Sequence, residues 1–158
     1  MSIKEEVDLL RRIPLFANVE PSKLKLLAFT SERIAFEDGH VLFKQGDIGD
    51  AAYIVMEGEA EVLVNGPVGP IQVAVLGHNA IVGEIAILCD VPRTATIKAR
   101  ERLVCLRISK ELFLRLLNEF PQIAIAVVRE LAHRIEMDNV KLQAALAEVE
   151  KLKASASA

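Results

Sequence analysis

Residues 83–96 combine residue types and a spacing that could do chemistry. Gly83 is followed directly by Glu84, and Arg93 comes nine residues after that glutamate. A glycine that opens a short helical turn leaves backbone N–H groups free to face an anion. Arg93 can form a planar, bidentate pair with phosphate oxygens. Glu84 can accept a hydrogen bond from a hydroxyl, but its negative charge repels other anions. The pattern suits a singly charged phosphate joined to a hydroxyl-bearing sugar.

The length and composition predict one ordinary globular domain over residues 1–158. Apolar residues make up 52% of the chain and charged residues 26%, which excludes disordered and collagen-like classes. The 19 basic and 22 acidic residues give a net charge of −3. That balance argues against a surface built mainly for nucleic acid or an anionic membrane, although it leaves room for a local basic pocket.

The sequence also predicts a cytoplasmic location. Its two cysteines, Cys89 and Cys105, are too few for a disulfide framework or a four-thiolate metal site. The longest apolar runs, residues 51–56 and 123–128, are far shorter than the roughly 20 residues that a membrane span needs. The charged N-terminus does not resemble a signal peptide.

Periodicity divides the chain into three segments. Residues 1–32 carry apolar side chains at helical spacing, residues 33–108 contain short β-rich runs, and residues 109–153 are helical again. The runs in the middle segment are Val41–Phe43, Ala52–Met56, Ala60–Val64, Ile71–Leu76, Thr94–Ala99 and Leu103–Ile108. Turn residues recur between them at the spacing of an antiparallel sandwich or barrel. We expect a mainly β domain, a β-roll or jelly roll of about eight antiparallel strands, with an N-terminal helical segment and a long C-terminal helix.

The C-terminal segment predicts a short helix followed by a long one. Ser109 is a suitable N-cap for a helix over residues 111–119, and Pro121 begins the next helix. That helix has heptad positions in 3-4 spacing, most of them apolar, at Ile125, Val128, Ala132, Ile135, Asn139, Leu142, Leu146, Val149 and Lys153. The repeat favours a parallel homodimer in which Asn139 sets the register. The alternative is that the first half packs on the β-roll and the polar second half is a solvated extension.

Residues 83–96 closely resemble the phosphate-binding cassette of the cyclic nucleotide-binding domain family. This family includes the sensing domains of catabolite activators and the regulatory subunits of cyclic nucleotide-dependent kinases. Residues 46–55 and 58–62 resemble the family's Gly-Asp turn and its flanking strands. The resemblance covers about residues 10–145.

The resemblance implies roles for individual residues. Arg93 would bind the cyclic phosphate with backbone N–H groups near Ala86 and Ala95, and Glu84 would bind the ribose 2′-OH. The full implied binding set is Gly83, Glu84, Ile85, Ala86, Arg93, Thr94 and Ala95, with Val73 and Val75 lining the base. Ile87 and Phe113 resemble the family's hinge pair, and the C-terminal helix would close as a lid.

The identity of the base is open at this point. Thr94 resembles the residue with which cGMP-preferring members contact guanine, but bacterial members with Ser or Thr there resemble cAMP binders. Asp138 and Asn139 fall where lid side chains reach the base, and a carboxylate there could accept from guanine donors. These residues slightly favour cGMP, and the expected ligand is cAMP or cGMP. One departure is Asn79, which we expect to take a left-handed conformation where the family often has glycine.

The remaining features favour a non-catalytic receptor. His40, His78 and His133 have no metal-site spacing, and no nucleophile motif is present, so we expect no enzyme activity, no metal and no cofactor. No helix-turn-helix segment follows the long helix, so we expect no direct DNA binding. The prediction is a stand-alone receptor that signals to an unidentified protein effector. The alternative is a ligand-free scaffold or interaction protein of the same fold.

Overall fold

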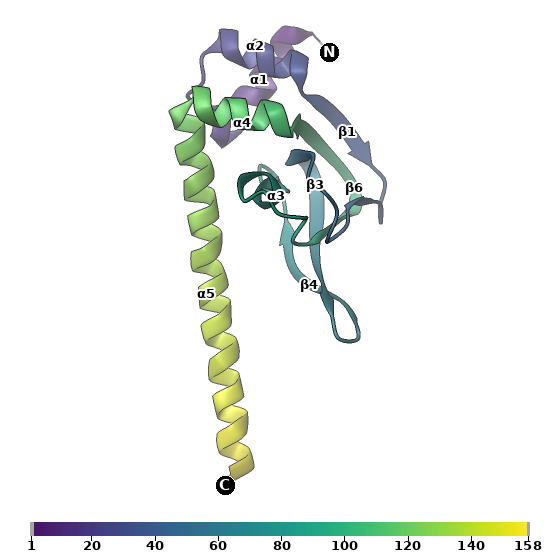
Figure 1. Cartoon of the computed structure of the whole chain (residues 1–158), viewed down its shortest axis with the longest axis vertical. Coiled ribbons are helices and arrows are strands. Elements are labelled where there is room, and N and C mark those ends of the chain that lie inside the picture. Colours follow the sequence, from purple (N-terminus) through teal and green to yellow (C-terminus); the bar gives the residue numbers. More distant parts are fainter. Residues whose placement is uncertain (1, 158) are drawn as a thin grey trace.

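A computed structural model describes residues 2–157, in which a β-roll is flanked by helices from both ends of the chain (Figure 1). The helices are α1 (Ile3–Arg11), the 3₁₀ turn η1 (Pro14–Phe16), α2 (Pro21–Thr30), α3 (Glu84–Leu88), α4 (Lys110–Glu119) and α5 (Pro121–Ser157). The strands are β1 (Glu32–Phe36), β2 (Val41–Phe43), β3 (Ala51–Gly66), β4 (Gly69–Leu76), β5 (Ile81–Val82) and β6 (Thr96–Ser109). The expected fold class is confirmed.

Local signals in the sequence set the ends of the helices. Ser2 and Glu5 form a capping box at the start of α1, which satisfies backbone N–H groups that the helix itself leaves unpaired. Pro21 and Pro121 occupy first helical positions, where the missing N–H costs nothing. Ser109 caps α4 by accepting a hydrogen bond from the backbone N–H of Leu112.

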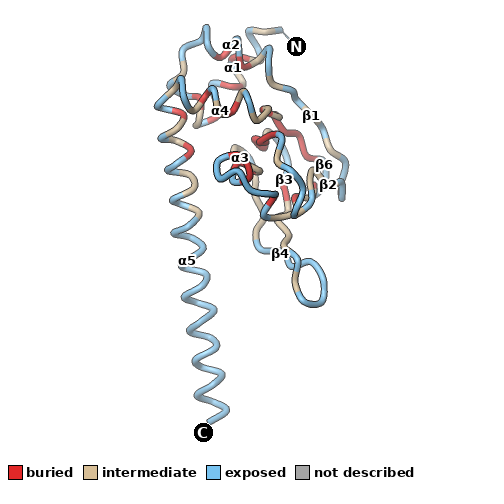
Figure 2. Tube along the Cα trace, viewed as in Figure 1, coloured by how far each residue is buried: buried red, intermediate tan, exposed pale blue. Residues whose placement is uncertain are grey.

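The long strands β3 and β6 hold the sheet together. The order is β1-β6-β3-β4, with β2 paired to β6 and β5 paired to β3, and every pairing is antiparallel. Alternate side chains of β3 serve two cores, because successive residues of a strand face opposite sides of the sheet. Ala52 and Ile54 pack with the helices, whereas Tyr53 and Val55 pack inside the roll. Figure 2 shows buried segments concentrated in these strands and in the adjoining helices.

The described residues contain six strands rather than the expected eight or so. Two pairs of predicted strands are continuous, namely 52–56 with 60–64 in β3 and 94–99 with 103–108 in β6. Glu57 and Gly58 lie at register shifts of β3 against β6, so the expected turn there is a bulge that bends a continuing strand. Two short strands, β1 and β5, were not among the predicted runs.

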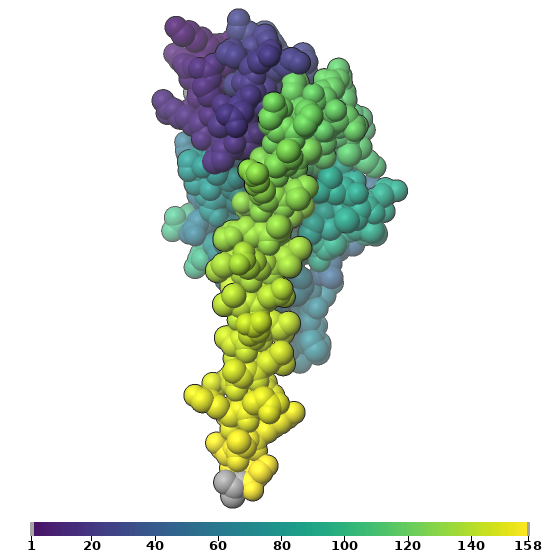
Figure 3. Space-filling view, turned by 90° about the vertical axis from the view of Figure 1, so that its left-hand side faces the viewer, coloured from purple at the N-terminus to yellow at the C-terminus, as the bar shows by residue number. Residues whose placement is uncertain are grey.

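The helix α5 extends further than predicted and lies largely apart from the body of the domain. It runs to Ser157 rather than to about Lys153, and only Ile123 and Val127 of its residues are buried. Both belong to the core that also contains residues of α1, α2 and α4. The C-terminal part of α5 projects beyond the rest of the chain (Figures 1 and 3). The first turns of α5 thus pack on the body of the domain, and the dimer seam of its later turns stays a prediction.

The bend of β3 at Gly58 provides a test of the fold. Gly58 has a φ of +84°, and a Cβ there would collide with the backbone oxygen of Arg102. We expect Gly58→Ala to reduce the free energy of unfolding by about 3 kcal/mol in urea titrations. Gly46 is the matched control, because it has a φ of +94° but a Cβ there would meet no atom within 4 Å. Gly46→Ala should cost about 1 kcal/mol, and equal losses at the two sites would contradict the steric account.

Candidate functional site

The cassette begins where β5 ends. Gly83 has a left-handed φ of +83° and directly precedes α3. A Cβ at Gly83 would lie 2.6 Å from Nη1 of Arg93, so only glycine lets the guanidinium approach this backbone. Gly49 is equally constrained, because its Cβ would lie 2.6 Å from the Cβ of Ala86. Two glycines thus allow α3 and Arg93 to pack closely.

Arg93 is held by the protein backbone. Its Nη1 donates to the carbonyl of Gly83 at 2.7 Å and its Nη2 donates to the carbonyl of Ala51 at 2.6 Å. The guanidinium carbon lies 3.9 Å from the centroid of the Phe43 ring, which is within range of a cation–π interaction. The residue is only 3% exposed. Its position is therefore fixed before any ligand is considered.

One polar atom of Arg93 stays unsatisfied. Nε is buried and has no hydrogen-bond partner among residues 2–157. The nearest carboxylate, Asp50, lies 3.6 Å from Nη2 and is 70% exposed. Burial lowers the pKa of Arg93, while Asp50 acts in the opposite direction. A buried cation with a free donor fits an anion such as a phosphate.

Glu84 is the second buried charged residue of the site. It is 2% exposed, and its Oε1 accepts a hydrogen bond at 2.9 Å from Nη1 of Arg134 on α5. Burial raises the pKa of Glu84, and the positive charge of Arg134 partly offsets that rise. A buried carboxylate needs such a partner, because removing it from water disfavours the charged form.

Arg134 is a residue of this site that the sequence analysis missed. Besides Glu84, it donates through Nη2 to the carbonyl of Ile81. Its Nε lies 3.4 Å from a Glu130 carboxylate oxygen, although no hydrogen bond forms there. The one signal in the sequence is weak, a Glu-Arg pair at helical i,i+4 spacing, which is typical of any exposed helix face. Only the fold shows that α5 passes the cassette at Arg134.

A cavity of about 90 Å³ lies between α3, the sheet and Arg134. Seven predicted binding residues line it, which are Gly83, Glu84, Ile85, Ala86, Arg93, Thr94 and Ala95. The structure thus brings together the whole segment that carried the sequence-based prediction. Their contacts with a nucleotide remain predictions.

The expected base-lining residues Val73 and Val75 are not part of this cavity, and the sheet contributes Val62 and Leu76 instead. Val75 pairs with Glu61, whereas Val62 pairs with Ala74, which is on the same face of β4 as Leu76. Val73 lies at a register shift between β3 and β4. The role of Val73 and Val75 in contacting the base stays a prediction.

Asp138 and Asn139 do not line the cavity either. Both are exposed, and α5 reaches the cassette one turn earlier, at Arg134. The expected lid contact at these two residues stays a prediction. Ile87 and Phe113, the expected hinge pair, are both buried and belong to the same hydrophobic core. Asn79 has a φ of +69°, so its expected left-handed conformation is confirmed.

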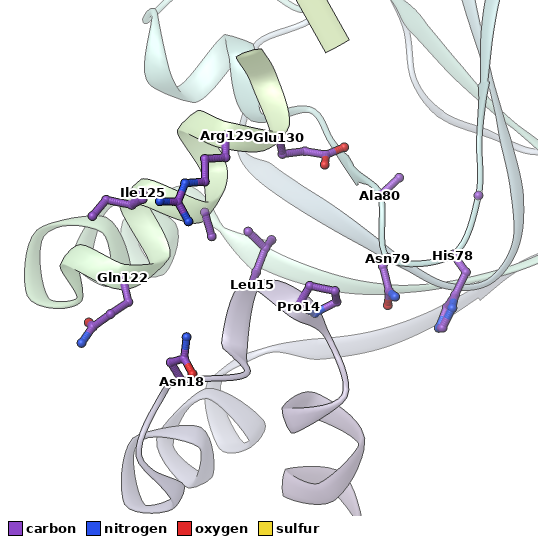
Figure 4. A pocket seen from close by; sticks show the side chains of 12 residues that line it. Pro14, Leu15, Asn18, His78, Asn79, Ala80, Gln122, Ile125, Arg129 and Glu130 are labelled. Atoms are coloured by element: carbon purple, nitrogen blue, oxygen red, sulfur yellow. The ribbon is translucent and has the colours of Figure 1, made fainter. Parts of the chain in front are cut away.

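A larger cavity, of about 690 Å³, lies between η1, the turn at His78 and Asn79, and the start of α5 (Figure 4). Size alone would favour it as a ligand site. However, Glu84 and Arg93 are the buried charged residues of the described chain, and neither lines this hollow. We therefore assign the candidate site to the smaller cavity, where both are present.

Metal-binding and membrane-spanning features are both absent from residues 2–157. No group of His, Cys, Asp or Glu side chains in this range could hold a metal ion. No helix in the same range combines the length and apolar character required to cross a membrane.

Comparison with known proteins assigns the family. A profile of the cyclic nucleotide-binding domain matches residues 33–120, and the chain belongs to this family. The chain is 37% identical over 117 residues to the cAMP-dependent protein kinase regulatory subunit of Blastocladiella emersonii, covering 72% of this chain and 28% of that protein. The corresponding subunit of Mucor circinelloides is 40% identical over 109 residues, covering 69% of this chain and 26% of that protein. The chain thus spans about a quarter of the length of these relatives.

The fold also matches a solved structure. The catabolite activator protein of Thermus thermophilus superposes with a TM-score of 0.71 at 28% identity, covering 82% of this chain and 62% of that chain. The resemblance inferred from the cassette motif is therefore confirmed at the level of fold and family.

The pairing of Glu84 with Arg134 predicts a pH-dependent stability. Arg134→Gln leaves a buried carboxylate without a cation, so the pKa of Glu84 should rise further. The folded state then binds the proton more tightly than the unfolded state, and stability falls as pH rises. In urea unfolding, we expect the variant to lose about 2 kcal/mol near pH 7.5 and clearly less near pH 5.

Two controls separate this effect from a general loss of packing. Arg129→Gln removes an exposed cation from the same helix and should change stability little at either pH. Adding Glu84→Gln to Arg134→Gln should abolish the pH dependence. A loss for Arg134→Gln that is the same at both pH values would show that the ion pair is not its cause.

Proposed function

We propose that the chain acts as a non-catalytic receptor for a cyclic nucleotide. The observation that carries this proposal is the buried guanidinium of Arg93, whose Nε has no partner among the described residues. Neutral backbone carbonyls accept its two hydrogen bonds, and the exposed Asp50 balances its charge only in part. A phosphate diester with one negative charge would supply both the missing acceptor and the missing charge.

The other cavity residues then have complementary tasks. The first N–H groups of α3 have no acceptor within the helix and would bind phosphate oxygens together with the backbone near Ala95. Glu84 would accept from the ribose 2′-OH. Val62 and Leu76 line the cavity and would offer an apolar surface to the base.

Ligand binding must change the arrangement around Arg134. The cavity of about 90 Å³ is much smaller than the roughly 300–1,000 Å³ that small-molecule sites usually provide, and Arg134 forms part of its wall. A nucleotide would displace or reposition this side chain and would thereby act on α5. We propose that the nucleotide shifts the population between two positions of α5, with α5 as the lid and Ile87 and Phe113 as the hinge.

We propose cAMP as the ligand, with cGMP as the second candidate. The related kinase subunits are named as cAMP-dependent. Asp138 does not line the cavity, so its argument for guanine depends on the proposed movement of α5. Thr94 lines the cavity and keeps the other argument for cGMP open.

We further propose that α5 forms a parallel homodimer. The predicted seam is solvent-exposed in the single chain, with exposed fractions of 63% for Ile135, 56% for Leu142 and 55% for Leu146. A helix with such an apolar stripe is marginal in water unless a partner covers it. In a parallel, in-register pair, a second copy would place the same apolar residues against this stripe, with Asn139 opposite Asn139. The dimer would give a cytoplasmic protein effector a ligand-dependent surface.

The alternative function, a ligand-free scaffold of the same fold, makes a different prediction about Arg93. A scaffold needs the guanidinium only to tie Gly83 to Ala51, whereas a receptor needs it for binding. The unsatisfied Nε favours the receptor, since a purely structural arginine would have its donors paired.

Calorimetric titration with cAMP and with cGMP tests the receptor. We expect saturable binding of at least one nucleotide to the nucleotide-free protein, and a loss of about 100-fold or more in Arg93→Lys, which keeps the charge but lacks the planar fork. Arg93→Glu should abolish binding. Arg100→Lys is the matched control at an exposed position. Absence of binding to the wild type would support the scaffold instead.

A pair of neighbouring substitutions tests the dimer. Leu142→Glu places a charge in the seam and should convert the dimer to a monomer in sedimentation experiments. Gln143→Glu makes the same charge change one residue away, outside the seam, and should leave the dimer intact. A wild-type chain that sediments as a monomer, or equal effects of both variants, would contradict the proposed interface.

A further inference from the structure

Arg134 has a second acidic neighbour on its own helix. Glu130 lies one turn earlier on α5, and its carboxylate oxygen is 3.4 Å from Nε of Arg134. This distance allows an ion pair, but the two groups form no hydrogen bond. A glutamate four residues before an arginine on a helix has the orientation that favours such a pair. Glu130 is therefore a second possible partner for the guanidinium that now contacts Glu84.

The present arrangement leaves Arg134 incompletely paired. Nη1 donates to Glu84 and Nη2 donates to the carbonyl of Ile81, and these two bonds orient the guanidinium. Nε is buried without an acceptor among residues 2–157. An unsatisfied buried donor costs free energy. A position in which the guanidinium donates to Glu130 would therefore recover part of the free energy that is lost when Arg134 leaves Glu84.

Space for such a movement lies on the side of Glu130. Arg134 lines the cassette cavity, whereas Glu130 lines the larger cavity of about 690 Å³. In Figure 4 the carboxylate of Glu130 extends toward Ala80, and the side chain of Arg129 extends to the other side of the helix. The position beside Glu130 is thus not occupied by Arg129, and the larger cavity can accommodate the guanidinium of Arg134.

The charges of the two glutamates also favour an exchange. Burial raises the pKa of Glu84, and the negative charge of Glu130 adds a smaller rise. Glu130 thus disfavours the charged form of Glu84 in the present arrangement. If Arg134 pairs with Glu130, it neutralises this charge, and Glu84 can accept from a ligand hydroxyl without facing an unpaired carboxylate.

We propose that Glu130 is a positioning residue that accepts Arg134 when a nucleotide binds. The ribose 2′-OH would replace Arg134 on Glu84, and the guanidinium would turn to Glu130 and leave the cassette cavity. The inference rests on the proposed receptor function and adds the residue that offsets the loss of the Glu84–Arg134 pair. Without Glu130, the displaced cation would have no charged acceptor on α5 at this position, and nucleotide binding would be weaker.

Calorimetric titration of the full chain with cAMP and with cGMP tests the exchange. We expect Glu130→Gln to weaken binding of the preferred nucleotide about fourfold, because the displaced Arg134 loses its charged acceptor. Glu136→Gln is the matched control, since it makes the same charge change at an exposed position of α5 and should leave the affinity unchanged. An unchanged or tighter affinity in Glu130→Gln, or an equal loss in Glu136→Gln, would overturn the proposal.

A double variant shows whether Glu130 acts through Arg134. In the background of Arg134→Gln, the further change Glu130→Gln should have no effect on nucleotide affinity. A loss that persists in this background would mean that Glu130 acts through packing or through its charge alone, which would contradict a positioning role.

A cycle without nucleotide separates this proposal from the receptor function. Glu130→Gln, Arg134→Gln and the double variant are compared in urea unfolding, with Glu84 present and in the background of Glu84→Gln. Because Glu84→Gln removes the charge that holds Arg134, the coupling between Glu130 and Arg134 should grow about threefold or more, as a ratio of unfolding constants. Equal or smaller coupling would overturn the exchange whether or not a nucleotide binds. The larger coupling in a protein that binds neither cAMP nor cGMP would support the exchange and overturn the receptor function.

Discussion

A buried guanidinium is the constraint on which the site depends. Arg93 is almost completely removed from water, so its N–H donors must find acceptors within the protein or from a ligand. The backbone carbonyls of Gly83 and Ala51 accept two hydrogen bonds, and Phe43 covers one face of the group. Nε remains without an acceptor among the described residues. The fold thus uses backbone acceptors to orient a charge that it neutralises only in part.

A second buried charge, that of Glu84, links the cassette to the long helix α5. The carboxylate of Glu84 is buried in the same cavity wall as Arg93 and is stabilised by Arg134, which α5 contributes from 50 residues further along the chain. Any group that competes for Glu84 must therefore act on α5. In this way, one ion pair connects the ligand site to the helix whose exposed stripe would contact a second copy.

The sequence predicted those parts of the molecule that local chemistry determines. The cassette was identified because Gly83, Glu84 and Arg93 lie in one short segment, and the structure places them around one cavity. Capping rules predicted where two helices begin, after Ser109 and at Pro121.

The errors concern non-local geometry. Glu57-Gly58 has the composition of a turn, but pairing across to β6 makes it a bulge. The face of β4 that meets the cassette depends on its register with β3, which local sequence does not determine, so the base-lining role of Val73 and Val75 stays a prediction. Arg134 was missed because the turn of α5 that approaches α3 depends on the angle at which α5 leaves α4.

The central claim is that the Nε–H of Arg93 donates a hydrogen bond to the phosphate of the bound nucleotide. The most direct measurement is the NMR resonance of the Arg93 Nε–H, assigned by comparison with Arg93→Lys, during titration with cAMP, cGMP and adenosine. The account predicts a downfield shift of this proton that saturates with a cyclic nucleotide and is absent with adenosine, which lacks the phosphate. A cyclic nucleotide that saturates the protein without moving this resonance would contradict the account.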